Sequence, residues 1–437
     1  MTELFSIARL PRIEFGAGSV KKLPGILARY GKRVLLVTGG HSFLGSPQWE
    51  CLSAALREQG FTWEVFRVTG GEPSPQLVDE AVAALRGGRF DVVLGIGGGS
   101  VLDAAKAIAG LLKPGNSVMD HLEGVGPELP YRGPATPFVA VPTTAGTGSE
   151  ATKNAVLSTH GPEGFKKSFR DEQLVPEYAV LDPDLLASCP PHLIAANGMD
   201  AFTQLLESFV SSKANPFTDA LAWSGMEAVR DGLPAWYENG GFPHPSPLPG
   251  GAPARSVPAG IGGNAAQSGE KGDEVPLRGI RLTAPAGRGK MAYAALLSGI
   301  TLAQVGLGSV HGLAAPLGAF FPIPHGVACG TLLEAATRVN IEAMEAREPA
   351  NPALAKYARV GRLLHGMKHM DDIAARCALL QSLEAWTERM GLPRLGEFGV
   401  GVADLPRIIA NCRGSSMKTN PVVLSDAEVG EVLRARL

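Results

Sequence analysis

The chain has 437 residues, with 40 basic and 42 acidic side chains and a formal net charge of −2. This length exceeds what one hydrophobic core usually organises, which predicts two domains, and the near-neutral charge gives no electrostatic reason to expect nucleic acid or an anionic membrane surface as a partner. Five scattered cysteines without a CxxC pair, and the lack of a signal sequence or of about 20 consecutive apolar residues, predict a cytoplasmic protein with structural cysteines.

The first half of the chain alternates short strand-like runs with helical patterns. A helical pattern covers residues 77–88, and the strand-like runs, several of which end in glycines, cover 33–40, 63–71, 90–100, 137–144 and 177–186. This rhythm predicts a parallel sheet in an α/β domain over residues 1–187. In such sheets ligands bind beyond the carboxyl ends of the strands, where these glycines lie.

The first glycine cluster lies in LGIGGGSVLDAAKAIAG, residues 94–110. Gly97, Gly98 and Gly99 would let the backbone approach a pyrophosphate at the start of a helix that Ser100 opens. A tight strand-to-helix turn needs glycine for steric reasons too, so both interpretations stay open. Asp103 and Lys106, on the same helix, either pair on a solvated face or point to the place where phosphate and substrate meet.

The second cluster, VPTTAGTGSEAT at residues 141–152, follows another strand. Its hydroxyls suit the ribose, phosphate or carboxamide of a dinucleotide, although a plain Ser/Thr turn has the same composition. Two such clusters at strand ends of one sheet favour a shared cofactor site. The candidates in this cluster are Thr143, Thr144, Thr147 and Ser149.

From about Ser188 the patterns become helical, which predicts an all-α domain over residues 188–437. It is interrupted at about 239–289 by a segment rich in Gly and Pro. Too little apolar surface is present there to offset the entropy of ordering, so we expect a flexible insertion. It is either a loop without a role or a lid or partner-binding loop.

Three residues of the helical half suggest a metal site. His311 and His325 bracket HGLAAPLGAFFPIPH, while Asp200 lies in NGMDAFTQLLESF and shares a helical face with Gln204. A mixed nitrogen and oxygen set suits Zn(II) or Fe(II) with a position left open, and such an ion would polarise a carbonyl beside a nicotinamide. A histidine on an apolar helix is also commonly a packed core residue, so spacing alone leaves the question open.

Five segments, taken in order, resemble the signature segments of the iron-containing (group III) alcohol dehydrogenases, which are related to glycerol dehydrogenase and dehydroquinate synthase. The resemblance covers nearly the whole chain apart from 239–289. It implies an N-terminal NAD(P)-binding domain, a C-terminal helical domain and a catalytic cleft between them. It further implies oxidation of alcohols or reduction of aldehydes and ketones with NAD or NADP, in a homodimer or higher homo-oligomer. The segments are GGGSVLDAAK, VPTTAGTGSEAT, LDPDL, GMDAFTQLLES and GSVHGLAAPLGAFFPIPHG.

The resemblance places the family's metal ligands on Asp200, His311 and His325, which are catalytic candidates together with Asp103. The family's other histidine ligand falls on Gln204, a weaker donor. This departure predicts one of three outcomes: weaker metal binding, a preference for zinc over iron, or a site with three protein ligands. Gln204 is then either a ligand or a neighbour of one. A second departure is Ala315, where many members carry a histidine. Its absence leaves the proton to travel by ordered water or by the cofactor ribose hydroxyl.

Cofactor choice depends on the end of the first long strand. NAD-preferring relatives often carry an acidic residue after its threonine, whereas this chain reads VTGGHS with Gly39, Gly40 and Ser42. Without a carboxylate to repel a 2′-phosphate we expect NADP to be accepted, with NAD still possible and with turn closure as the alternative role of the glycines.

The leading hypothesis is thus hydride transfer between NAD(P)H and a small carbonyl at a divalent metal. Two alternatives stay open: an enzyme of the dehydroquinate synthase type without net consumption of NAD, and a degenerate paralogue that binds dinucleotide without catalysis.

Overall fold

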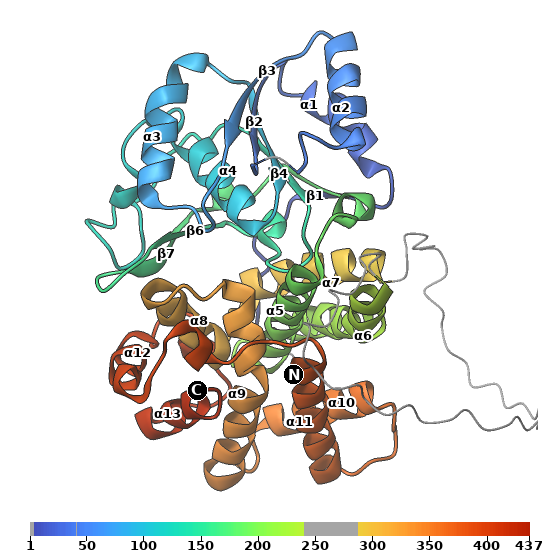
Figure 1. The fold of residues 1–437 in the computed structure, drawn as a ribbon, viewed down its shortest axis with the longest axis vertical. Helices are drawn as coiled ribbons and strands as arrows, with labels where there is room; N and C mark the ends of the chain where they lie inside the picture. The colour runs from blue at the N-terminus through green and yellow to red at the C-terminus, as the bar shows by residue number, and fades with distance from the viewer. Residues whose placement is uncertain (1–3, 41, 240–286) are drawn as a thin grey trace, which may run out of the picture.

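The computed structural model describes residues 4–40, 42–239 and 287–437. His41 and most of the predicted 239–289 insertion lie outside the described residues. Within them, the chain folds into a sheet with flanking helices followed by a helical half (Figure 1).

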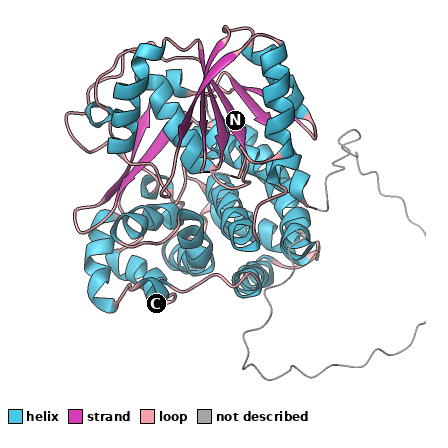
Figure 2. Ribbon diagram, turned by 45° about the horizontal axis from the view of Figure 1, so that its top comes forward, coloured by secondary structure: helices cyan, strands magenta, loops and turns pink. Residues whose placement is uncertain are grey.

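The first half is built on a six-stranded parallel sheet in the order β1-β8-β5-β4-β2-β3, with helices on both faces (Figure 2). Val34 and Leu36 of β2 pack in one buried cluster, while Leu35 and Val37 pack in another. Because both faces of the central strands are covered, β2, β4, β5 and β8 are nearly continuous apolar runs, which the sequence analysis predicted. The edge strands β1 and β3 are more exposed, and β1 was not predicted. The strands are β1 Arg12–Phe15, β2 Arg33–Thr38, β3 Thr62–Arg67, β4 Val92–Gly97, β5 Phe138–Pro142 and β8 Tyr178–Leu181.

Four helices cover the sheet. One buried cluster joins the sheet to α3 and α4, and the other joins it to α1 and α2. Proline in the first turn and a serine N-cap start both α2 and α3, as is common for helix N-termini. The helices are α1 Leu23–Leu27, α2 Pro47–Glu58, α3 Pro75–Leu85 and α4 Gly99–Leu111.

The second half is helical, so the predicted fold class is confirmed. Helix α5 lies at its centre, buried along almost its whole length and packed on α6, α7 and α9. Among the described residues no single helix is long and apolar enough to cross a membrane, whereas α7 and α8, bent by 100° to each other, meet that test of length and composition as a pair. The helices are α5 Pro191–Val210, α6 Pro216–Asn239, α7 Arg288–Val305, α8 Ser309–Phe320, α9 His325–Arg347, α10 Pro352–His365, α11 Asp372–Arg389, α12 Leu405–Asn411 and α13 Asp426–Arg434.

Short 3-10 helices and one further pair of strands complete the chain. The antiparallel hairpin of β6 Asn154–Thr159 and β7 Phe165–Arg170 contacts α4 on one side and α8 on the other. The sequence did not predict this hairpin, because FKKSFR carries charge at positions that a buried strand would fill with apolar residues. The 3-10 helices are η1 Ser19–Lys22, η2 Arg86–Gly88, η3 Val118–Asp120, η4 Ser149–Ala151, η5 Glu172–Leu174, η6 Pro183–Leu186, η7 Leu395–Phe398, η8 Val402–Asp404 and η9 Met417–Thr419.

Candidate active site

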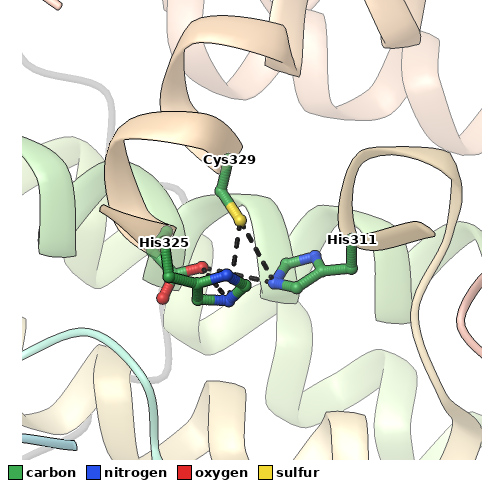
Figure 3. A group of neighbouring side chains, drawn as sticks. His311, His325 and Cys329 are labelled. Atoms are coloured by element: carbon green, nitrogen blue, oxygen red, sulfur yellow. Dashed lines mark hydrogen bonds and ion pairs between the residues drawn. The ribbon is translucent and has the colours of Figure 1, made fainter. Parts of the chain in front are cut away.

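Four potential metal donors meet between three helices of the second half. Asp200 comes from α5, His311 from α8, and His325 and Cys329 from the first two turns of α9. Their ligand atoms all lie within 4.8 Å of one another, and Figure 3 shows His311, His325 and Cys329 pointing toward a common point. The structure thus brings together the three residues predicted from the sequence and adds Cys329, which the sequence analysis had grouped with the structural cysteines.

The distances within this cluster are short. Asp200 Oδ1 lies 3.2 Å from His311 Nε2 and 3.9 Å from His325 Nε2. Cys329 Sγ lies 3.6 Å from His311 Nε2 and 3.7 Å from His325 Nε2. Asp200 and Cys329 are fully buried, so their polar atoms depend on each other or on a bound ion rather than on bulk water.

Two observations show that the cluster fits a divalent cation. Asp200 Oδ2 and His325 Nδ1 are buried and have no hydrogen-bond partner among the described residues. Burial by itself raises the pKa of Asp200, but the adjacent His325 and His311 lower it to about 2. Burial, together with the nearby Lys166 cation, lowers the pKa of His325 to about 4. An ionised Asp200 and a neutral His325 are the protonation states that a metal requires of these two ligands.

Burial by itself lowers the pKa of His311, but Cys329, Glu207 and Asp200 raise it well above its usual value, and burial raises the pKa of Cys329 to about 12. These two groups would therefore release a proton when an ion binds.

Glu207 lies outside the donor cluster and contacts His311, one of its members. Its Oε2 lies 2.6 Å from His311 Nδ1, and its Oε1 accepts a hydrogen bond of 2.7 Å from the backbone N–H of Val310. A proton on Nδ1 that is donated to Glu207 leaves the lone pair of Nε2 facing Asp200. The sequence analysis missed Glu207, although it lies two helical turns after Asp200 on the same face of α5.

Gln204 is buried one turn after Asp200, but its amide is already engaged. Ser298 Oγ of α7 donates a hydrogen bond of 2.7 Å to Gln204 Oε1. The oxygen that would bind a metal is therefore held toward α7. Ala315, at the other departure from the family pattern, lies half-buried on α8 and offers no polar group.

The two predicted cofactor clusters face each other at neighbouring strand ends. Strand β4 ends at Gly97, whose carbonyl accepts a hydrogen bond of 2.9 Å from the N–H of Thr143 after β5. A Cβ on Gly99 would lie 2.6 Å from Thr147 Cγ2, and one on Gly98 would lie 3.3 Å from Thr144 Cγ2. Only glycine therefore fits at Gly99. Ser100 and the three threonines, which lie around the start of α4, are half-exposed. A phosphate could therefore reach the backbone N–H groups at this helix N-terminus.

Residues after β2 lie at the same edge of the sheet. A Cβ on Gly39 would lie 3.8 Å from Val101 Cγ2 in the first turn of α4. Gly39 and Gly40 are half-exposed, and Ser42 is exposed. The structure thus brings Gly39 beside the first turn of α4, which follows the glycine cluster of β4.

Lys106, Ser149 and Asp103 form a buried hydrogen-bond network. Lys106 is fully buried, and its Nζ donates hydrogen bonds to the Ser149 carbonyl at 2.8 Å, to Thr152 Oγ1 at 3.0 Å and to the Asn154 carbonyl at 2.6 Å. Ser149 Oγ donates in turn to Asp103 Oδ1 at 2.5 Å. Burial lowers the pKa of Lys106 to about 8. Lys106 Nζ also lies 3.8 Å from Asp103 Oδ1, so the two residues pair as one of the two alternatives predicted, although in a buried place and not on a solvated face.

The cofactor loop and the metal cluster are joined through α7. Gly148 has a φ of +61°, and a Cβ there would lie 2.4 Å from Gly299 Cα, so glycine is required both by the backbone conformation and by the close approach of the helix. The next residue back along α7 is Ser298, which holds Gln204. Helix α7 thus fixes the threonine loop relative to α5, which carries Asp200.

Comparisons with known proteins agree with this arrangement. Residues 11–183 match the family model of iron-containing alcohol dehydrogenase, and residues 194–241 and 282–437 match the C-terminal model of the same family. The chain is 31% identical over 435 residues to 1-propanol dehydrogenase PduQ of Salmonella typhimurium, covering 98% of each chain. It is 27% identical to the NAD-dependent methanol dehydrogenase of Bacillus methanolicus, again over 98% of each. A solved archaeal alcohol dehydrogenase from a Red Sea brine pool superimposes with a TM-score of 0.82 at 25% identity, covering 100% of this chain and 99% of that one. The chain therefore belongs to the iron-containing alcohol dehydrogenase family.

Proposed function

We propose that the chain is a metal-dependent, NAD(P)-linked alcohol dehydrogenase or carbonyl reductase, in which Asp200, His311 and His325 hold one divalent ion, Fe(II) or Zn(II). The observation that carries this proposal is the buried donor cluster, which α7 links to the glycine and threonine loops of the parallel sheet. When bound, the ion supplies a Lewis acid that polarises a carbonyl oxygen and lowers the pKa of an alcohol.

The protein groups have distinct tasks in this proposal. The backbone at Gly97–Ser100 binds pyrophosphate, and Thr143, Thr144 and Thr147 orient the ribose and the nicotinamide. Glu207 holds His311 in the tautomer that presents Nε2. Ala315 cannot exchange a proton, so the proton of the alcohol leaves by water or by the ribose hydroxyl.

The substrate class is a small alcohol, aldehyde or ketone. In support, the similar proteins include 1-propanol and methanol dehydrogenases and the lactaldehyde reductase of Escherichia coli. For the cofactor we propose that NADP is accepted beside NAD, because no carboxylate follows Thr38 at Gly39, Gly40 or Ser42.

Three broader features belong to the same proposal. The chain divides into domains near residue 187, between β8 and α5, and works as a homodimer or higher homo-oligomer. It resides in the cytoplasm, which fits five cysteines that are all free in the part of the chain that the structure describes.

A direct test uses protein stripped of metal and reloaded with Fe(II) or Zn(II). Loss of reduced-nicotinamide absorbance is followed with a panel of small aldehydes and ketones, comparing NADPH with NADH. We expect metal-dependent oxidation with at least one carbonyl. His325→Ala should lower turnover by more than about 100-fold, because losing a ligand costs more than losing its support, whereas His369→Ala, at an exposed position, should not.

Two results would contradict the proposal. Full activity of His325→Ala would show that the ligand assignment is wrong. If protein that binds both metal and cofactor oxidised no reduced nicotinamide with any carbonyl of the panel, the proposed substrate class would be wrong.

A further inference from the structure

Cys329 occupies a position that packing alone does not explain. It lies one helical turn after His325 on the same face of α9, fully buried, with Sγ at 3.6 and 3.7 Å from the Nε2 atoms of both predicted histidine ligands. We propose that Cys329 is a thiolate ligand of the same ion, so that the protein donors are one carboxylate, two imidazoles and one thiolate. This inference rests on the proposed metal site and identifies its fourth protein donor and its preferred metal.

Three of the four donor-atom distances given above lie close to those of a common tetrahedral centre, and the fourth, from Asp200 Oδ1 to His325 Nε2, is longer. With metal–nitrogen distances of about 2.0 Å and a metal–sulfur distance of about 2.3 Å, a tetrahedral ion holds its nitrogen and sulfur ligands about 3.5 Å apart. The two observed Sγ to Nε2 distances, 3.6 and 3.7 Å, lie close to that edge. The corresponding nitrogen-to-oxygen edge is about 3.3 Å, compared with 3.2 and 3.9 Å from Asp200 Oδ1 to the two imidazoles.

The alternative is that Cys329 is a small apolar core residue, as buried cysteines usually are. A core thiol needs only apolar neighbours, whereas Cys329 faces two imidazole nitrogens and a carboxylate. Its single proton cannot satisfy both imidazoles and would leave Asp200 Oδ2 without a partner. A cation at the centre can take one donor atom from each of the four groups, and its binding releases the thiol proton to solvent.

The neighbouring residue Gln204 supports the same assignment. It occupies the position where relatives carry a further histidine, but Ser298 Oγ already donates to its amide oxygen. The fourth protein donor therefore comes from α9 rather than from α5. A thiolate is a soft ligand that favours Zn(II) over Fe(II). Catalytic zinc sometimes expands to five donors in the transition state, and that expansion is what a site with four protein donors would need for a substrate oxygen to approach.

The experiment uses Co(II) as a spectroscopic probe. The full-length protein is stripped with a chelator and titrated with Co(II), while the near-ultraviolet band of thiolate-to-cobalt charge transfer is recorded and bound cobalt is quantified. In the wild type we expect the band to grow until one equivalent of Co(II) has been added. The control Cys412→Ser should behave in the same way, because it changes a buried cysteine that donates a hydrogen bond to the Ile409 carbonyl and lies outside the donor cluster. Cys329→Ser should bind cobalt without the band. Its Zn(II) affinity, measured by competition with a chromophoric chelator, should fall by at least about 10-fold.

The outcomes separate this inference from the proposed function. Stoichiometric cobalt without a thiolate band in the wild type would overturn the role of Cys329 while leaving the three-ligand site intact. Failure of the wild type to bind either Co(II) or Zn(II) would overturn both. The wild-type spectrum decides by itself, so the test does not depend on Cys329→Ser folding, which circular dichroism checks.

Discussion

At the scale of single residues, Glu207 shows how a side chain that touches no substrate sets the properties of the site. It ties the N–H of Val310 and the Nδ1 of His311 to α5, so it fixes both the start of α8 and the orientation of the imidazole. A carboxylate in this position makes the opposite ring nitrogen a stronger donor.

We therefore expect Glu207→Gln to weaken Zn(II) binding by about 10- to 100-fold, because the amide lacks the negative charge and keeps only one of the two acceptor oxygens that face Val310 and His311. Competition with a chromophoric chelator measures this change. Glu342→Gln, at an exposed position on α9, is the matched control. Equal affinity of Glu207→Gln and the wild type would mean that the charge of Glu207 has no influence on the site.

The sequence could supply only part of this constellation. Asp200, His311 and His325 lie in motifs that identify them without a structure. Glu207 and Cys329 lie outside the expected ligand set, and their contribution depends on which helix face they occupy and on what lies opposite. A glutamate in an apolar helix resembles a surface charge and a buried cysteine resembles a core residue, so only the packing of α5, α8 and α9 distinguishes them.

At the scale of elements, the turn between β4 and α4 depends on the absence of side chains. Gly99→Val would place a branched side chain against Thr147, where even a Cβ comes within 2.6 Å of Cγ2. The threonine loop must then move away from the start of α4, and in the proposed cofactor site the backbone N–H groups there would no longer be placed to bind phosphate.

We expect this variant to bind NADPH and NADH at least about 10-fold more weakly, a loss of about 1.4 kcal/mol or more. Titration of nicotinamide fluorescence measures the affinity. Gly87→Ala provides the control, because a Cβ there meets nothing within 4 Å. If Gly99→Val bound cofactor as tightly as that control, the phosphate site would lie elsewhere.

The elements that could be predicted are those in which the pattern of apolar residues follows the burial of the element. Strands β2, β4, β5 and β8 are buried on both faces, which makes them unbroken apolar runs. The β6–β7 hairpin is only partly buried and has a register fixed by contacts with α4 and α8. Its residues therefore carry a mixed pattern, which local sequence cannot separate from a loop.

At the scale of the whole molecule, the proposed metal ion is a cross-link. Its donors come from α5, α8 and α9, which are separated in the chain by the 240–286 segment and by several turns. An ion bound only by the folded arrangement stabilises the protein by RT ln(1 + [M]/Kd), which is about 2.7 kcal/mol at a hundredfold excess over Kd.

The melting temperature of stripped protein should accordingly rise with Zn(II), by an increment that grows with the logarithm of the free concentration. Asp200→Asn should lose most of this increment, because its amide binds the ion far more weakly than a carboxylate that the neighbouring histidines keep ionised despite its burial. Thermal denaturation at a series of free Zn(II) concentrations, buffered by a chelator, measures the slope of melting temperature against the logarithm of free Zn(II) for the wild type and for Asp200→Asn. Equal slopes in the two proteins would show that zinc stabilises the fold somewhere other than at the junction of α5, α8 and α9.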